Sequence, residues 1–271
     1  MTSGEQWAAA ELEELRARRF APWAWTHLLS ASFTRAAETR KARPRLTRQA
    51  RTWSAAGLCA GVAVCSSGRF PAPQRSRFAL WWLATSAMLD WHLGMLEGAD
   101  GEQRGRLSAG DAFTLLRLWG IPFLWVHGDP AQASAPAFTA LITAAAVTDA
   151  LDGAFARRAG PTRLGRDLDT VADTMTSLTA TRAAHRAGWL PAGAAGLVTA
   201  RSTIPILVIA ATYFRTGQRL ETTAPRATRQ IAPILFAGLA VAPASSRAGA
   251  TLSSAASIGA LTIAWRTRCT S

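Results

Sequence analysis

The chain has 271 residues, a formal net charge of +13 and a pI near 11.5, and its mean hydropathy is only slightly positive because Ala supplies much of the apolar content. This length allows one or two domains with a large core, and the charge suits a nucleic-acid binder or a protein on anionic lipid. The three cysteines have no metal-ligand spacing, so we interpret them as small packing residues.

Residues 1–53 are polar, contain ten Lys or Arg and lack an apolar run long enough for a signal peptide. A charged helix is expected over residues 11–19. It is followed by a patch of Phe20, Trp23, Trp25, Leu28 and Leu29, and then by seven basic residues. A basic segment with an aromatic patch is typical of a helix on a membrane surface. A solvated tail and a nucleic-acid arm are alternatives, but the segment leads directly into apolar sequence.

Two apolar segments follow, at residues 53–68 and 78–96. The first is near the lower limit for crossing a hydrocarbon core of ~30 Å. The second carries Asp90 and His92 near its end, where an interfacial position costs little, so we do not interpret them as a site. Residues 1–107 are therefore predicted to be a basic N-terminal extension with a surface helix and about two membrane spans.

Six further apolar segments are predicted as spans, at residues 111–127, 134–156, 168–187, 192–214, 231–242 and 250–265. Trp125, Trp189 and Trp265 lie at segment ends, as expected for interfacial aromatic belts. No strand-like alternation or fixed repeat is present. The predicted fold is an all-α integral membrane helical bundle, with a six-span catalytic domain at residues 108–271.

An acidic motif occupies the second and third of these segments. Asp149, Asp152, Gly153 and Ala156 share one helix face, and Gly165, Asp169 and Asp173 share another, because positions three and four apart align. Gly160 and Pro161 between them predict a turn. The antiparallel helices would bring four carboxylates together, whose repulsion requires cations. Two divalent ions would balance them, and oxygen ligands favour Mg²⁺ or Mn²⁺.

The same residues carry a family resemblance. Asp-x2-Asp-Gly-x2-Ala-Arg at residues 149–157, then Gly-x3-Asp-x3-Asp at 165–173, resembles the signature of the CDP-alcohol phosphotransferases, which are integral membrane enzymes of phospholipid synthesis. The spacer between Arg157 and Gly165 has seven residues where about eight are expected, which a loop tolerates. Asp111, Thr114, Arg117 and Pro122 are similar to the family's first core helix, with Asp in place of Asn. Asp111 either contacts substrate or caps the helix.

The resemblance covers about residues 108–268 and implies a reaction. A phosphatidyl (phosphoalcohol) group would pass from a CDP-linked lipid, usually CDP-diacylglycerol, to an alcohol, with release of CMP. Asp149, Asp152 and Asp169 would be metal ligands, and Asp173 the general base and a further ligand. Gly153, Ala156 and Gly165 would leave room for the donor, and Arg157 would grip it. Close helix packing is an alternative role for Gly153 and Ala156.

An arginine lies inside the 192–214 segment. Because a charge within a span is costly, Arg201 should face a cavity or a counter-charge. We interpret it as a clamp for a phosphorylated acceptor such as glycerol 3-phosphate or inositol phosphate, with Arg182 and Arg226 as further acceptor-binding candidates. A structural ion pair with a motif carboxylate, or snorkelling, is the alternative for Arg201.

Arginine counts predict the topology. Loops 157–166 and 215–229 carry four Arg each, whereas the opposite loops carry none in 128–133 and one each in 185–191 and 243–249. The positive-inside rule places the motif on the cytoplasmic face of the cell membrane. Arg69, Arg75 and Arg77 would fall outside, against the rule.

Other functions predict other patterns. The same chemistry with an unphosphorylated acceptor stays open, and a divalent-metal transporter would need carboxylates at mid-membrane. A nucleic-acid binder would not need six apolar segments, so no nucleic-acid partner is expected. The expected partners are the CDP-linked lipid, the acceptor and membrane lipids, and a homodimer is compatible. Because the family pattern starts near residue 108, a chain beginning at about Ser108 is expected to retain some catalysis.

Overall fold

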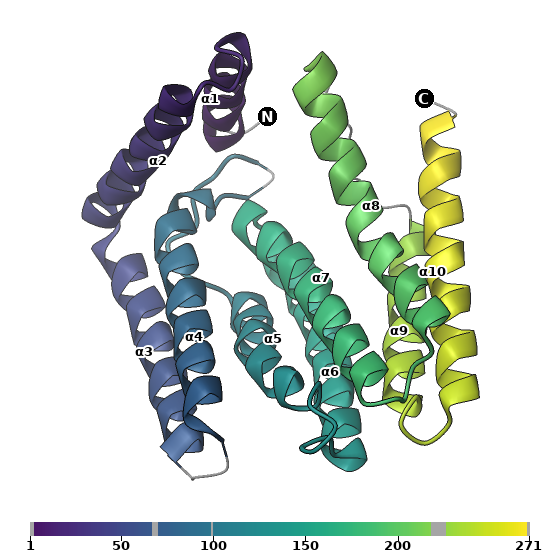
Figure 1. The fold of residues 1–271 in the computed structure, drawn as a ribbon. Helices are drawn as coiled ribbons and strands as arrows, with labels where there is room; N and C mark the ends of the chain where they lie inside the picture. The colour runs from purple at the N-terminus through teal and green to yellow at the C-terminus, as the bar shows by residue number, and fades with distance from the viewer. Residues whose placement is uncertain (1–2, 67–69, 99, 218–225, 270–271) are drawn as a thin grey trace. The chain divides into compact units, whose positions relative to one another are not determined.

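The computed structural model describes residues 3–66, 70–98, 100–217 and 226–269, with the side chains of residues 3, 156–159, 226–230 and 266–269 outside the description. The described residues form helices and no strand, which confirms the all-α prediction (Figure 1). In chain order the helices are α1 (Ser3–Ala17), α2 (Pro22–Ala42), α3 (Pro44–Ser66), α4 (Ala72–His92), the 3-10 turn η1 (Leu93–Met95), α5 (Ala109–Val126), α6 (Ala135–Ala159), α7 (Arg163–Arg186), α8 (Ala192–Thr216), α9 (Arg226–Val241) and α10 (Ser246–Cys269).

The helices group into two compact units. Unit 1 comprises Met1–Trp119 and Ala150–Val171, and unit 2 comprises Gly120–Asp149 and Ala172–Ser271. Helices α5, α6 and α7 therefore each contribute residues to both units. The boundary predicted at residue 107 rests on resemblance rather than on contacts, so it stays a prediction.

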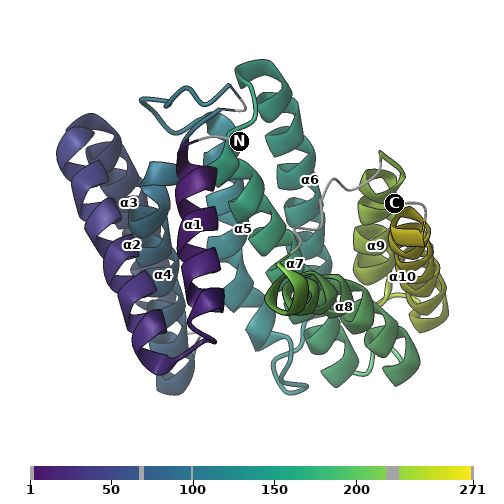
Figure 2. The same cartoon turned by 90° about the horizontal axis from the view of Figure 1, so that it is seen from above.

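Unit 1 joins the N-terminal extension to parts of the motif helices. Helix α3 packs along α4, and α1 packs on α2 (Figure 2). Leucines from the extension lie in one buried cluster with leucines of α5 and α7, namely Leu46, Leu89, Leu93, Leu96, Leu107, Leu115 and Leu164. The extension and the start of α7 therefore share a hydrophobic core.

Helix α5 contains a proline, and α4 compensates for it. Pro122 has no N–H to donate to the carbonyl of Leu118 one turn earlier. The indole Nε1 of Trp81 donates to that carbonyl at 2.8 Å. The adjacent indole of Trp82 donates to the carbonyl of Trp119 at 3.0 Å. Two tryptophans of the extension thus satisfy backbone oxygens of the predicted catalytic domain.

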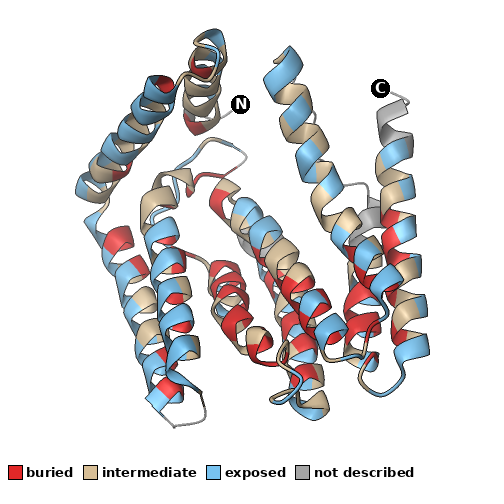
Figure 3. Ribbon diagram, viewed as in Figure 1, coloured by how far each residue is buried: buried red, intermediate tan, exposed pale blue. Residues whose placement is uncertain are grey.

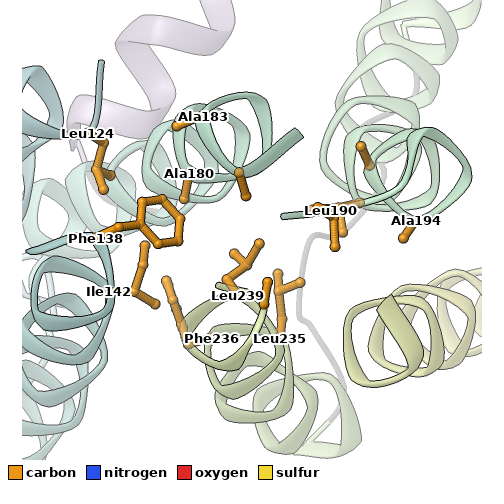
Figure 4. Packing of buried hydrophobic residues seen from close by; sticks show 14 of the residues in the cluster. Leu124, Phe138, Ile142, Ala180, Ala183, Leu190, Ala194, Leu235, Phe236 and Leu239 are labelled. Atoms are coloured by element: carbon orange, nitrogen blue, oxygen red, sulfur yellow. The ribbon is translucent and has the colours of Figure 1, made fainter. Parts of the chain in front are cut away.

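Unit 2 has its own core, formed by Phe138, Ile142, Leu235, Phe236 and Leu239 with alanines of α7 and α8 (Figure 4). Helices α9 and α10 lie side by side in Figures 1 and 2. A Cβ on Gly249 would come within 2.6 Å of Ala242. Small residues at this contact allow the close approach that is common between membrane helices.

The outward faces of several helices are apolar. Ala135–Phe155, Ala192–Thr216 and Ser246–Trp265 are long and apolar enough to cross a membrane, and Ile231–Val241 is a shorter apolar helix. Only 17% of the most apolar window of Ala192–Thr216 is buried, so most of that helix needs an apolar solvent. Figure 3 shows exposed residues along α8 and α10 in pale blue. The chain is a membrane protein by this criterion, while the total of six plus two spans stays a prediction.

Candidate active site

Helices α6 and α7 form the predicted helix–turn–helix. Gly160 adopts a positive φ of 82°, a conformation that favours glycine, and Pro161 follows it. The hydroxyl of Thr162 accepts a hydrogen bond from the backbone N–H of Gly165 at 3.0 Å. Thr162 therefore caps the N-terminus of α7, which carries the second half of the motif.

In unit 1, two motif carboxylates are joined by one arginine. Asp152 is buried, and its Oδ2 accepts a hydrogen bond from Arg117 Nη2 at 3.0 Å. The same Nη2 pairs with Asp169, and the Thr114 hydroxyl donates to Asp152. The side chain of Arg117 is 1% exposed, so its charge is buried beside these carboxylates. Arg117 thus joins Asp152 of α6 to Asp169 of α7 through one guanidinium nitrogen.

Two glycines allow this approach. A Cβ on Gly110 would come within 2.9 Å of Asp152 Oδ1, and one on Gly165 would come within 3.0 Å of Asp111 Oδ1. The N-terminus of α5 therefore packs directly against both halves of the motif. The missing side chain at Gly165 is predicted to leave room for the donor. In unit 1, Asp111 occupies part of that space.

Asp111 belongs to the cap of α5. Its Oδ2 accepts a hydrogen bond from the Ser108 backbone N–H at 2.7 Å, and its own N–H donates to Ser108 Oγ at 3.2 Å. This reciprocal pair is a capping box with Ser108 as the N-cap. Of the two roles predicted for Asp111, the capping role is the one that the contacts support, with Asp111 in the first turn rather than at the cap itself.

In unit 2, the other two motif carboxylates meet. An oxygen of Asp149 lies within 4.8 Å of one of Asp173. Asp149 precedes Asp152 by three residues on α6, and Asp173 follows Asp169 by four on α7, so each pair shares a helix face. The structure therefore keeps the predicted stripes on both helices.

These residues fit a divalent metal. Asp149 and Asp173 would repel at this distance without a cation between them. All four motif groups are carboxylates, which are the ligands that hard ions such as Mg²⁺ and Mn²⁺ prefer. In unit 1, the guanidinium of Arg117 neutralises part of the charge of Asp152 and Asp169. Bound metal ions would balance the remaining negative charge of these carboxylates.

The structure describes some of the other predicted site residues. Gly153 lies on α6 after Asp152, while the side chains of Ala156, Arg157 and Arg226 lie outside the described residues. Arg201 of α8 interacts electrostatically with Asp173, and its buried Nε has no hydrogen-bond partner among the described residues. Arg182 of α7 has an exposed side chain.

Sequence reasoning gave Arg117 no role in the site. The signal was available, because Arg117 lies in an apolar helix and a charge there needs a counter-charge. Arg201 of α8 carries the same signal. Gly110 carried no comparable signal, since only the three-dimensional approach of α5 to Asp152 shows why a side chain is excluded there.

Fold and site together define an all-helical membrane protein with a carboxylate site suited to divalent cations. The family model described as CDP-alcohol phosphatidyltransferase matches residues 107–265. The chain therefore belongs to the CDP-alcohol phosphatidyltransferase family, as the motif predicted. No curated protein and no solved structure matches the chain. Membership makes it a transferase that moves a phosphoalcohol group from a CDP-alcohol to an acceptor, in a family that is generally divalent-metal dependent.

Proposed function

We propose that the protein transfers a phosphatidyl group from CDP-diacylglycerol to a phosphorylated alcohol and releases CMP. The observation that carries the proposal is the carboxylate pair Asp149 and Asp173, within 4.8 Å, in a chain of this family. The apolar outer faces of its helices suit a lipid-linked donor, whose acyl chains need lipid or an apolar helix surface.

The reaction requires one bond to form and one to break. The acceptor hydroxyl oxygen bonds to the phosphorus that carries the diacylglycerol, and the bond between that phosphorus and the oxygen of CMP breaks. CMP leaves with the electron pair. Asp173 accepts the hydroxyl proton, since it is the motif carboxylate assigned as general base.

The metal ligands in this proposal are Asp149, Asp152, Asp169 and Asp173. Two bound Mg²⁺ or Mn²⁺ ions would supply Lewis-acid stabilisation of the charge that develops on the leaving phosphate. The chain's own residues hold this geometry: Arg117 and Thr114 orient Asp152, and Arg117 orients Asp169. Gly153, Ala156, Arg157 and Gly165 are proposed to receive the donor.

Arg201 is proposed to bind the phosphate of the acceptor, with Arg182 and Arg226 as further candidates. Its guanidinium is partly buried, is close enough to Asp173 to interact with it, and keeps a buried Nε available. An acceptor phosphate at Arg201 would place the acceptor hydroxyl on the side of the general base. An unphosphorylated alcohol would bring no anion to pair with the Arg201 guanidinium.

The test is CMP release by the purified protein in lipid nanodiscs containing CDP-diacylglycerol. Glycerol 3-phosphate, inositol phosphate, glycerol, inositol and serine are compared as acceptors with Mg²⁺ or Mn²⁺ present. Release that depends on a phosphorylated acceptor supports the proposal, and faster release with an unphosphorylated one refutes the acceptor assignment. Metal flux into liposomes without CMP release would instead favour a transporter.

A further inference from the structure

The segment between α4 and α5 contains a carboxylate that is entirely buried. Glu97 is 0% exposed and follows η1 within unit 1. Its Oε1 lies 3.4 Å from Nη1 of Arg163, whose side chain is 16% exposed. A buried carboxylate is costly unless it is paired, so this pair constrains where the two segments can lie.

The backbone reinforces the pair. The N–H of Arg163 donates to the carbonyl of Glu97 at 2.9 Å. The next residues, Gly98 and Thr162, form an antiparallel bridge. Segments that are far apart in the sequence are thus joined by their main chains as well as by an ion pair.

What these contacts hold is the start of α7. Arg163 is the first residue of α7, and Thr162 is its cap. Leu164 is 1% exposed and packs in the leucine cluster with Leu96. Asp169 lies six residues after Arg163 on the same helix, or roughly 9 Å along its axis. A shift or tilt of the first turn would therefore carry the Asp169 carboxylate with it.

A second cation lies in the field of the same carboxylate. Burial lowers the pKa of the Arg43 guanidinium, and the negative charge of Glu97 acts in the opposite direction. Arg43 is the C-cap of α2, so the carboxylate also interacts with the helices of the extension. An apolar residue of similar volume would fill this place without the desolvation cost, so a charge here indicates a need for defined geometry.

We propose that Glu97 is a positioning residue for the transfer reaction, acting through Arg163 and the start of α7 to set Asp169 against Arg117 and Asp152. This inference rests on the proposed function for its kinetic consequence. Its geometric part, the effect of Glu97 on the metal-ligand set, can be measured without turnover.

The experiment compares Glu97→Gln with Glu102→Gln in nanodiscs. Both variants remove one carboxylate from the same connecting segment, but the side chain of Glu102 is exposed. Three quantities are measured: kcat for CMP release at saturating substrates, the donor KM, and Mn²⁺ affinity by electron paramagnetic resonance. Glu97→Gln should lower kcat by about tenfold or more and weaken Mn²⁺ binding several-fold, while the donor KM changes little. Glu102→Gln should match the wild type in all three.

Arg163→Gln and the double variant Glu97→Gln/Arg163→Gln test whether Glu97 acts through Arg163. If Glu97 acts through Arg163, the double variant should lose no more activity than the worse single variant, because both single changes break one interaction. Full additivity would overturn the route through Arg163. If Glu97→Gln does not fold, Arg163→Gln is compared with Arg163→Lys, which keeps the charge. Only Arg163→Gln should lower kcat and Mn²⁺ affinity, and equal values in the two variants would overturn the proposal.

A lowered melting temperature of Glu97→Gln with wild-type kcat and Mn²⁺ affinity would overturn the proposal and leave Glu97 with a purely structural role. Failure of the proposed function gives a different result. The wild type would then release no CMP with any acceptor, yet the Mn²⁺ affinities of the variants would still decide whether Glu97 positions the carboxylates.

Discussion

Arg117 contributes a fixed positive charge between two of the four motif carboxylates. Its side chain is almost wholly buried and contacts Asp152 and Asp169. Asp152 depends on this cation, since breaking a buried pair leaves an uncompensated charge. The Asp152–Asp169 pair of unit 1 therefore forms a group of two acids and one base. Positive charge from the protein and from the metals would together neutralise it.

The first prediction concerns the carboxylates. Asp152→Asn and Asp169→Asn should reduce CMP release below detection, because an amide is a poor ligand for Mg²⁺ where a carboxylate is needed. Excess chelator should have the same effect on the wild type, and added Mg²⁺ or Mn²⁺ should restore activity. Both variants should still fold, as judged by gel filtration in detergent.

Asp167→Asn is the matched control for these variants. Asp167 lies in the same segment, but its side chain is exposed and pairs with Arg166 at 3.6 Å. Exposed pairs of this kind contribute little, so activity should stay near that of the wild type. Full activity in excess chelator would rule out the two-metal interpretation.

The second prediction concerns Arg201. Arg201→Ala should raise the apparent KM for a phosphorylated acceptor by about tenfold or more, as expected from about 1.5–3 kcal/mol for a charge-assisted hydrogen bond. Affinity for CDP-diacylglycerol should change little, because Arg157 and the metals are proposed to hold the donor. Arg186→Ala is the control, since Arg186 lies exposed at the end of α7. Damage to donor binding alone would contradict the assignment.

Sequence patterns predicted the carboxylates of the candidate site but not the residues that support them. The spacing of Asp149, Asp152, Asp169 and Asp173 predicted their stripes because helix periodicity fixes which residues share a face. Glu97 and Gly110 could not be found in this way. Their importance depends on contacts with residues far away in the chain, and no local pattern encodes such contacts.

At the scale of helices, α3 and α4 act on the backbone of α5. The Gln49 amide donates to the Leu107 carbonyl at 3.2 Å, and its oxygen accepts from the Leu107 N–H at 2.9 Å. Trp81 and Trp82 donate hydrogen bonds to the carbonyls of Leu118 and Trp119 in the middle of α5. The extension therefore holds α5, the helix that carries Arg117, both just before its start and near its proline.

The third prediction tests the tryptophan contact. Trp81→Phe removes the donor to the Leu118 carbonyl and should lower the free energy of unfolding by about 1–3 kcal/mol. In a Pro122→Ala background the new backbone N–H can bond to that carbonyl, so the same change should cost less. The free energy of unfolding in mixed micelles is measured for four proteins: the wild type, Trp81→Phe, Pro122→Ala and the variant with both changes.

Trp82→Phe is the internal control. Its acceptor is the carbonyl of Trp119, which is followed one turn later by Phe123 rather than by a proline. The cost of Trp82→Phe should therefore be similar with Pro122 and in the Pro122→Ala background. An equal cost of Trp81→Phe in both backgrounds would show that the proline is irrelevant to the contact.

The fourth prediction concerns the extension as a whole. The family match begins at residue 107, which favours some catalysis by a chain starting at Ser108. That chain would lack Trp81, Trp82 and Glu97, so α5 and α7 would lose three sets of contacts. We therefore expect little or no CMP release from the truncated protein. Near-wild-type release would confirm the extension as accessory and contradict the role given to Glu97.

On the scale of the whole molecule, apolar runs predicted the helices well. Each predicted segment from 111–127 to 250–265 corresponds to one helix from α5 to α10. Hydropathy does not mark helix α7 as a membrane span. It is not among the helices of spanning character, because its many polar residues lower its hydropathy. Four of them, Thr176, Ser177, Thr179 and Thr181, are buried. Apolarity identifies helices that face lipid, whereas a polar helix buried in protein has no such signature.

The last prediction concerns topology, which rests on the arginine-rich loops at 157–166 and 215–229. In a chain whose natural cysteines, Cys59, Cys65 and Cys269, are replaced, Ala131→Cys and Thr222→Cys report the two sides. An impermeant maleimide added to intact cells should label Ala131→Cys, and it should label Thr222→Cys only after permeabilisation.

The physical reason is the cost of translocating a basic loop. The 215–229 segment carries four Arg and the 128–133 segment none, so the first should stay in the cytoplasm. Because loop 157–166 joins α6 to α7, its side of the membrane is also the side of the four carboxylates. The opposite labelling pattern would place the site outside, away from cytoplasmic CDP-linked donors. Each variant must still release CMP at the wild-type rate, so that only correctly folded chains are counted.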